Sequence, residues 1–166
     1  MESTTYRELP QGDVRLIGDP IARRLLGSDA LARLAYLGKD GTPRVIPMGF
    51  VWNGSEIVMA TFARSAKLAA LRARPDVAIT IDHAGPPPDV LLVRGRAVLD
   101  PVAGVAPEYE QVQRKYYGDE QAEQVLAMIR EQGVSMVRIV VAPSWVSTLD
   151  FQTRNPGALV AAGLAS

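Results

Sequence analysis

Short apolar runs separated by turn residues recur along most of this chain. They have the length and the β-branched and aromatic content that are typical of strands. The runs cover residues 30–37, 44–52, 56–61, 77–82, 90–100, 135–143 and 145–151. Turn chemistry at 38–43 (GKDGTP) favours a strand rather than a helix for the Leu- and Ala-rich first run, and Asn53-Gly54 is a strong hairpin signal after the second. The pattern therefore predicts six or seven strands that are connected largely by hairpins.

Three residues inside these runs predict irregularities. Pro47 cannot donate a ladder hydrogen bond, so we expect its strand at an edge of the sheet or at a bulge. Gly95 lies within a long run and predicts a bulge or a close approach of another backbone. Pro143 is expected to break the last two runs into separate strands.

Helical patterns occupy three places in the chain. Asp19 suits the N-cap of a short helix that begins at Pro20 and ends at Gly27. A second helix is predicted after Ser65, broken before the next strand by Pro75-Asp76. Residues 106–133 predict two helices separated at Gly118-Asp119, and the second of these has an apolar face formed by Ala122, Val125, Leu126 and Ile129.

This order of elements contains no strand–helix alternation and no repeat. We therefore predict a mainly β (α+β) fold, an antiparallel barrel of six or seven strands with short helices packed outside it. Residues 1–154 form one domain in this interpretation, and residues 155–166 are expected to be a flexible C-terminal tail.

Composition excludes several classes of function. The 166 residues are 48% hydrophobic and contain 18 basic and 18 acidic residues, so nothing indicates a nucleic-acid partner. The absence of cysteine excludes disulfides, thiolate metal sites and a cysteine nucleophile. No secretory signal pattern and no apolar run of ~20 residues is present, so we expect no membrane partner and a cytoplasmic location.

Two cations and a hydroxyl lie where a strand gives way to a helix. Arg64, Ser65 and Lys67 surround the predicted helix start, where unpaired backbone N–H groups and the helix dipole favour an anion. The arrangement suits one terminal phosphate. The plainer alternative is a solvated helix start with ordinary surface cations, and the local sequence by itself favours that alternative.

Other candidate chemistry is sparse. His83 is the only histidine, and no partner residues indicate a catalytic role or a metal site. No nucleophile elbow, phosphate-binding P-loop or dinucleotide GxGxxG motif occurs. Large aromatic residues are expected mainly in the core or at a dimer interface, although they could border a planar ligand; these are Trp52, Trp145, Tyr116, Tyr117 and Phe151.

The segment ARLAYLGKDGTPRVIPMGFVWNGSEIVMATFARSAKLAALRARPDVAITID resembles the split-barrel flavin-binding family of pyridoxamine-phosphate-oxidase-like and deazaflavin-dependent oxidoreductases. The shared order is a strand, a DG-P turn, an apolar PMGFVW strand, a hairpin, a strand ending in Thr and a basic S-K helix. It covers roughly residues 30–100. The resemblance implies a homodimer with FMN or coenzyme F420 at the interface.

Carried over residue by residue, the resemblance implies that Arg64, Ser65 and Lys67 hold the cofactor phosphate. It places the backbone at Pro47, Met48 and Gly49, together with Ala60 and Thr61, against the ring. The chain departs from true pyridoxamine phosphate oxidases near its C-terminus, where DFQTRNPGAL offers only Arg154, so vitamin B6 oxidation is not expected.

The first functional hypothesis is an oxidoreductase that uses FMN or F420 to transfer hydride to or from a small organic substrate. No catalytic side chain is required for this, because the cofactor carries the chemistry. The alternatives are a carrier that binds FMN or F420 without turnover and a split barrel that serves only dimeric interaction. Arg44, Arg72 and Arg74 could line a basic groove for the acidic tail of F420, or they could be ordinary surface residues.

Overall fold

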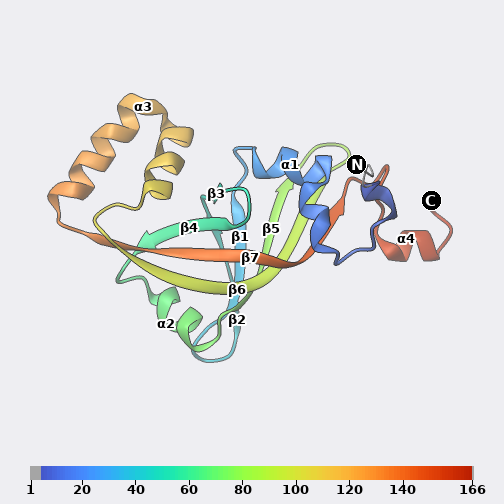
Figure 1. Ribbon diagram of the computed structural model, residues 1–166, viewed down its shortest axis with the longest axis horizontal. Coiled ribbons are helices and arrows are strands. Elements are labelled where there is room, and N and C mark those ends of the chain that lie inside the picture. Colours follow the sequence, from blue (N-terminus) through green and yellow to red (C-terminus); the bar gives the residue numbers. More distant parts are fainter. Residues whose placement is uncertain (1–4, 166) are drawn as a thin grey trace.

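A single antiparallel sheet of seven strands forms the body of the molecule (Figure 1). The structure is a computed structural model that describes residues 5–165. The strands are β1 (Ala32–Leu37), β2 (Pro43–Met48), β3 (Val51–Trp52), β4 (Ile57–Phe62), β5 (Asp76–His83), β6 (Asp89–Ala103) and β7 (Ser135–Leu149). Their order in the sheet is β2-β1-β5-β6-β7-β4-β3, with antiparallel pairing throughout. The split-barrel, mainly β fold predicted from the sequence is confirmed.

Strands β6 and β7 are the long central pair of the sheet. The predicted irregularity at Gly95 is present as a register shift, in which Arg94 pairs with Trp145 and Gly95 pairs with Pro143. Ser144 is the extra residue, and its hydroxyl donates to the Arg94 carbonyl at 3.1 Å. The prediction that Pro143 ends a strand was wrong, because this bulge accommodates the proline and β7 continues to Leu149.

The apolar run at 44–52 does not form one strand, and this prediction was also wrong. Residues up to Met48 pair with β1, whereas Val51 and Trp52 pair with β4 at the opposite end of the strand order. The chain changes direction at Gly49. If residue 49 carried a Cβ atom, that atom would overlap the Val112 side chain and lie 3.3 Å from Tyr116. Pro47 does lie in an edge strand, as predicted.

The helices lie outside the sheet. Helix α1 (Pro20–Leu26) begins at Asp19, whose carboxylate accepts a hydrogen bond from the Ile21 N–H at 2.8 Å, and it ends at Gly27. Helix α2 (Ala66–Ala73) follows β4. Helix α3 (Pro107–Glu131) forms two arms about Gly118, whose φ of 75° is not helical, and this confirms the predicted break. The remaining short elements are the 3₁₀ turns η1 (Tyr6–Glu8) and η2 (Val14–Gly18) and helix α4 (Gly157–Ala161), which lies in the expected C-terminal tail.

The hydrophobic core lies between the inner face of the sheet, α1 and α2. Its fully buried side chains include Leu25 from α1, Leu71 from α2, Ile79 from β5 and Ile139 from β7. In the part of the chain that the structure describes, no helix is long and apolar enough to cross a membrane.

The N-terminal segment is held against the end of β7 by a buried arginine. Arg154 is 7% exposed, and its guanidinium donates to the carbonyls of Tyr6, Leu9 and Thr148. These three acceptors account for its burial, so Arg154 is a structural residue in this fold.

Candidate functional site

The junction of β4 and α2 leaves two backbone donors free. Ser65 has an extended conformation and occupies the N-cap position, as predicted, but its hydroxyl makes no capping bond. The N–H of Leu68 donates to the Ser65 carbonyl at 3.1 Å. Among residues 5–165, the N–H groups of Ala66 and Lys67 have no hydrogen-bond acceptor. They are therefore available to an anion at the positive end of the helix dipole.

Within residues 5–165, the Lys67 ammonium donates hydrogen bonds to neutral groups only. Its Nζ donates to Thr61 Oγ1 at 3.0 Å and to Ser65 Oγ at 2.6 Å. Burial lowers the pKa of Lys67, because desolvation disfavours the charged form. No carboxylate is paired with it among the described residues. The structure thus brings Thr61, Ser65 and Lys67 into one polar cluster whose positive charge has no counter-ion.

A cavity of about 300 Å³ opens from this cluster between α2 and the β1–β2 turn. Lys39, Arg44 and Lys67 supply three cations to its wall, against the single carboxylate of Asp40. Hydrogen bonds from Thr42 and from Arg44 lower the pKa of Asp40 to about 2, so that carboxylate stays charged at neutral pH. We call this space the Lys67 cavity, and its remaining wall is formed by Tyr36, Gly38, Ala66 and Ala70.

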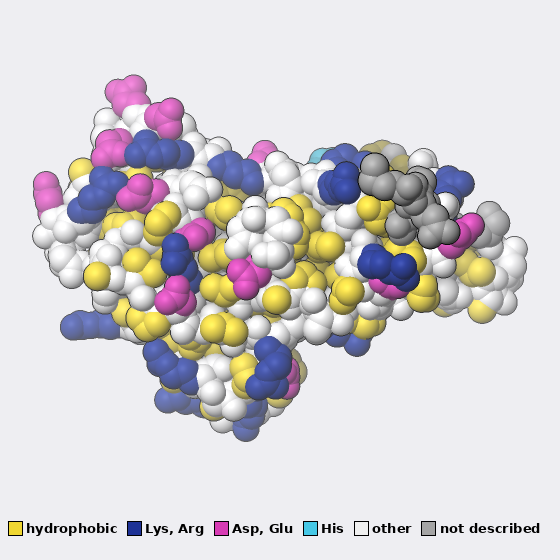
Figure 2. All heavy atoms as spheres, in the orientation of Figure 1, with side chains coloured by type: hydrophobic (Ala, Val, Ile, Leu, Met, Phe, Trp, Pro, Cys, Tyr) yellow, Lys and Arg dark blue, Asp and Glu magenta, His cyan; other side chains and the backbone are white. Residues whose placement is uncertain are grey.

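Basic side chains gather on the surface around the Lys67 cavity. In Figure 2 the lower part of the molecule, over α2 and the turn between β1 and β2, is rich in lysine and arginine. Arg72 and Arg74 are exposed there on and just after α2. Arg74 donates to the Gly38 carbonyl at 2.7 Å, and this bond joins α2 to the turn.

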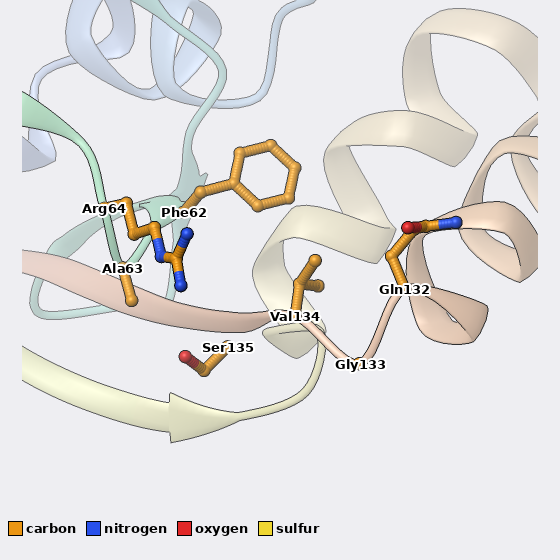
Figure 3. Close-up of a pocket in the computed structure, with 7 residues that line it drawn as sticks. All are labelled: Phe62, Ala63, Arg64, Gln132, Gly133, Val134 and Ser135. Carbon is orange, nitrogen blue, oxygen red and sulfur yellow. The ribbon is translucent and has the colours of Figure 1, made fainter.

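Arg64 lies in a different cavity from Lys67. This second space has a volume of about 390 Å³ and lies between the end of β4 and the turn that connects α3 to β7 (Figure 3). We call it the Arg64 cavity, and its wall consists of Phe62, Ala63, Arg64, Gln132, Gly133, Val134 and Ser135. No hydrogen bond joins Arg64 to Ser65 or to Lys67 in the described chain. Of the three residues that the resemblance assigns to one phosphate, Arg64 and Lys67 therefore line different cavities, and Ser65 is bonded to Lys67.

The predicted ring-contacting residues come from two separate parts of the sheet. Pro47 and Met48 end the edge strand β2, and Gly49 follows them with α3 packed over its α-carbon. Ala60 and Thr61 belong to β4, near the other end of the strand order. No hydrogen bond joins the two groups among the described residues, and whether both contact a ring remains a prediction.

The structure also shows the positions of His83 and of the large aromatic residues. His83 is exposed at the end of β5, and no group of potential metal-ligating side chains occurs among residues 5–165. The Arg94 guanidinium lies over the Trp145 ring, with its carbon 4.1 Å from the centroid of that ring. Of the aromatic residues expected at an interface, Tyr117 is 53% exposed, whereas Tyr116 packs against Gly49.

Sequence reasoning did not identify the β1–β2 turn as part of the site. Lys39 and Asp40 were interpreted only as turn residues, since nothing nearby in sequence indicates that α2 will lie against them. The available signal was Lys39, a cation inside a tight turn that precedes the strand carrying Arg44.

Comparisons with known proteins agree with this architecture. The family model described as pyridoxamine 5'-phosphate oxidase matches residues 19–148. A solved F420 reductase is 27% identical with a TM-score of 0.57, over 74% of this chain and 93% of that one. A conserved hypothetical protein from Mycobacterium tuberculosis shares 23% identity (TM-score 0.60; 80% and 84% coverage). The heme storage protein HutZ from Vibrio cholerae shares 15% identity with a TM-score of 0.55, over 78% of this chain and 92% of that one. At these two lower identities the likeness concerns the fold alone.

No curated protein matches the chain. The family match spans most of the chain, from the N-cap of α1 to the last residues of β7. It includes every strand and the polar cluster of Thr61, Ser65 and Lys67. The chain therefore belongs to the pyridoxamine 5'-phosphate oxidase family.

Proposed function

We propose that this protein binds a phosphorylated flavin or deazaflavin and that Lys67 is the main anchor of its phosphate. The supporting observation is a partly buried ammonium held only by two hydroxyls, Thr61 Oγ1 and Ser65 Oγ. An ammonium has three N–H donors, so one remains for a phosphate oxygen. The free N–H groups of Ala66 and Lys67 add two further donors next to it. A phosphate fits this donor set because it supplies both the missing charge and the missing acceptors.

Coenzyme F420 is the cofactor that the surroundings favour. Its acidic oligoglutamate tail requires a cationic surface, which FMN does not. Lys39 and Arg44 in the Lys67 cavity provide such a surface within reach of the phosphate anchor. Arg44 already pairs with Asp40, so Lys39 is the freer of the two cations. The likeness to an F420 reductase at 27% identity supports the same choice.

The proposed activity is that of an oxidoreductase acting on a small organic substrate. The bound cofactor supplies hydride transfer, and the protein residues bind it, orient it and exclude water. Thr61 and Ser65 fix the Lys67 ammonium, and the edge of β2 at Pro47 and Met48 supplies backbone against which a planar ring can lie. No histidine or carboxylate is required at the reacting atoms, in keeping with the exposed position of His83.

A cofactor carrier without turnover is the alternative function. It needs the same phosphate anchor and the same basic surface, so binding alone does not separate it from the enzyme. Oxidation of the reduced, bound cofactor by a test acceptor does separate them. An enzyme accelerates that oxidation relative to free cofactor in solution, whereas a carrier leaves it unchanged or slows it.

The test of the proposal is a titration of F420, FMN and riboflavin into wild type and Lys67→Ala. A hydrogen bond to a charged group contributes about 1.5–3 kcal/mol, so F420 affinity should fall by roughly one to two orders of magnitude. Riboflavin, which lacks the phosphate, should bind weakly to both proteins. Arg23→Ala is the control, because it removes an exposed cation from α1 that lines neither cavity.

Two results would contradict the proposal. One is a wild-type protein that binds neither F420 nor FMN, which would favour the barrel as a dimeric interaction module. The other is a Lys67→Ala variant, folded by circular dichroism, that binds both phosphorylated cofactors as tightly as wild type. FMN binding tighter than F420 binding would reverse only the choice of cofactor.

A further inference from the structure

The Arg64 cavity has an aromatic wall whose position is fixed. Phe62, the last residue of β4, is 39% exposed at this cavity. Its ring packs edge-on against Tyr109 of α3, with centroids 5.8 Å apart and an interplanar angle of 61°. The floor is also fixed, because the Ala63 N–H donates to the Ser135 carbonyl at 3.0 Å. A planar ligand would meet a preformed apolar surface here.

The cation in the cavity, Arg64, has no partner among the residues that the structure describes. Arg64 makes no hydrogen bond or ion pair with any residue from 5 to 165, and its guanidinium is directed from β4 toward the space beside Val134 and Ser135 (Figure 3). Arg130 and Arg138, in contrast, are both paired with glutamates. No acidic side chain lines the cavity among the described residues. A guanidinium in this state matches a carboxylate, which it can bind through two parallel hydrogen bonds.

The other groups in the wall are neutral and polar. Gln132 and Ser135 also line the cavity and can donate or accept hydrogen bonds, and in Figure 3 the Gln132 amide points away from Arg64. A volume of about 390 Å³ lies within the range of sites for small organic molecules. The Arg64 cavity contains one localised positive charge, whereas several line the Lys67 cavity.

We propose that the Arg64 cavity binds an aromatic carboxylate, with the carboxylate on Arg64 and the ring against Phe62. This makes Arg64 a substrate-binding residue rather than a third ligand of the cofactor phosphate. One part of this inference rests on the proposed function, namely that the bound molecule is the substrate of a redox enzyme. Binding of the carboxylate itself does not depend on the cofactor.

The experiment uses benzoate as the probe and benzamide as its uncharged counterpart. Each is titrated by isothermal calorimetry into wild type, Arg64→Ala, Phe62→Ala and the control Arg23→Ala, all checked for folding by circular dichroism. Wild type should bind benzoate at least tenfold more tightly than benzamide. Arg64→Ala should lose about tenfold or more in benzoate affinity and little in benzamide affinity. Phe62→Ala should weaken both, and Arg23→Ala neither.

The same variants are titrated with F420 to keep this inference distinct from the proposed function. Arg64→Ala should leave F420 affinity within about twofold of wild type, whereas Lys67→Ala lowers it. A loss of F420 affinity in Arg64→Ala with benzoate binding unchanged would overturn the inference and return Arg64 to the phosphate site. Benzoate binding no tighter than benzamide binding in wild type would also overturn it. Arg64-dependent benzoate binding in a protein that binds no cofactor would support the inference and contradict the proposed function.

Discussion

The role of a cationic side chain in this molecule depends on the hydrogen-bond acceptors that the fold places around it. Arg154 and Lys67 show the contrast. Arg154 is buried among three carbonyl groups that satisfy its guanidinium, whereas among the described residues the Lys67 ammonium meets two hydroxyls and no negative charge. The first arrangement is complete within the protein. The second becomes complete only when an anion arrives, and this is why Lys67 rather than Arg154 indicates a binding site.

Asp150 yields a prediction about acid stability at the residue scale. Burial raises its pKa, but hydrogen bonds from the Thr153 hydroxyl and from the N–H groups of Arg154, Gln152 and Thr153 outweigh this and lower it to about 2. The ionised carboxylate therefore stabilises the fold above the ordinary pKa near 3.8, and this contribution is lost as the pH falls through about 2. Asp150→Asn should be slightly less stable than wild type at pH 7, within about 1 kcal/mol, because solvent screens the partly exposed group.

The check is a series of urea unfolding curves for both proteins between pH 7 and pH 2. The difference in free energy of unfolding should shrink toward the acid end, as Asp150 in wild type becomes protonated. A difference that is constant over this range would show that the charge of Asp150 has no part in it.

At one point in the sheet, two strands approach each other too closely to leave room for a side chain. At the bulge between β6 and β7, a Cβ atom on Gly95 would lie 2.6 Å from the Ala142 carbonyl oxygen and 2.7 Å from Val141 Cγ1. A carbonyl in a central ladder cannot move aside without breaking the pairing. The bulge therefore depends on glycine at this position.

Gly95→Ala should destabilise the protein by about 1–3 kcal/mol, the usual cost of forcing an extra group into a packed region. Gly157→Ala is the control, since nothing lies within 4 Å of a Cβ there and its φ is not positive. Differences in urea midpoint measure both changes. Equal stability of the two variants would show that the two central strands separate easily at the bulge.

Local signals predicted the elements well, and contacts between distant segments account for what they missed. Asp19 and Gly118 set a helix start and a helix break through chemistry within a few residues of themselves, and both predictions were confirmed. The separation of β2 from β3 at Gly49 depends on Val112 and Tyr116, which lie more than sixty residues further along the chain. The division of Arg64 and Lys67 between two cavities likewise depends on which segments lie on either side of β4.

The whole molecule presents an outward row of side chains that suits a second copy of the chain. Val45, Ala35, Ala78, Arg94 and Trp145 are successive register partners across five strands, so they share one face. Val45 is 64% exposed at the edge strand. Homodimerisation, which the family resemblance implies, remains a prediction, and this row is where we expect the contact.

Light scattering at micromolar concentration should give the mass of a dimer for wild type and a smaller average mass for Val45→Glu. The charge would have to be buried without a partner at the interface, and such burial is costly. Val160→Glu, at an exposed valine of α4, should leave the mass unchanged. A monomeric wild type, or a Val45→Glu variant that remains fully dimeric, would place the contact elsewhere or remove it.

The position of β7 has a consequence for how the protein is made on the ribosome. This strand lies between β6 and β4 in the sheet, yet it is the last strand in the chain. At about 5–20 residues per second, roughly 4–17 s pass between synthesis of the end of β4 and that of the end of β7. During that interval β4, and β6 once it has been made, each have an unpaired edge, so the nascent chain is more prone to aggregation than the finished molecule. Expression at reduced temperature or with added chaperones should therefore raise the yield of folded protein.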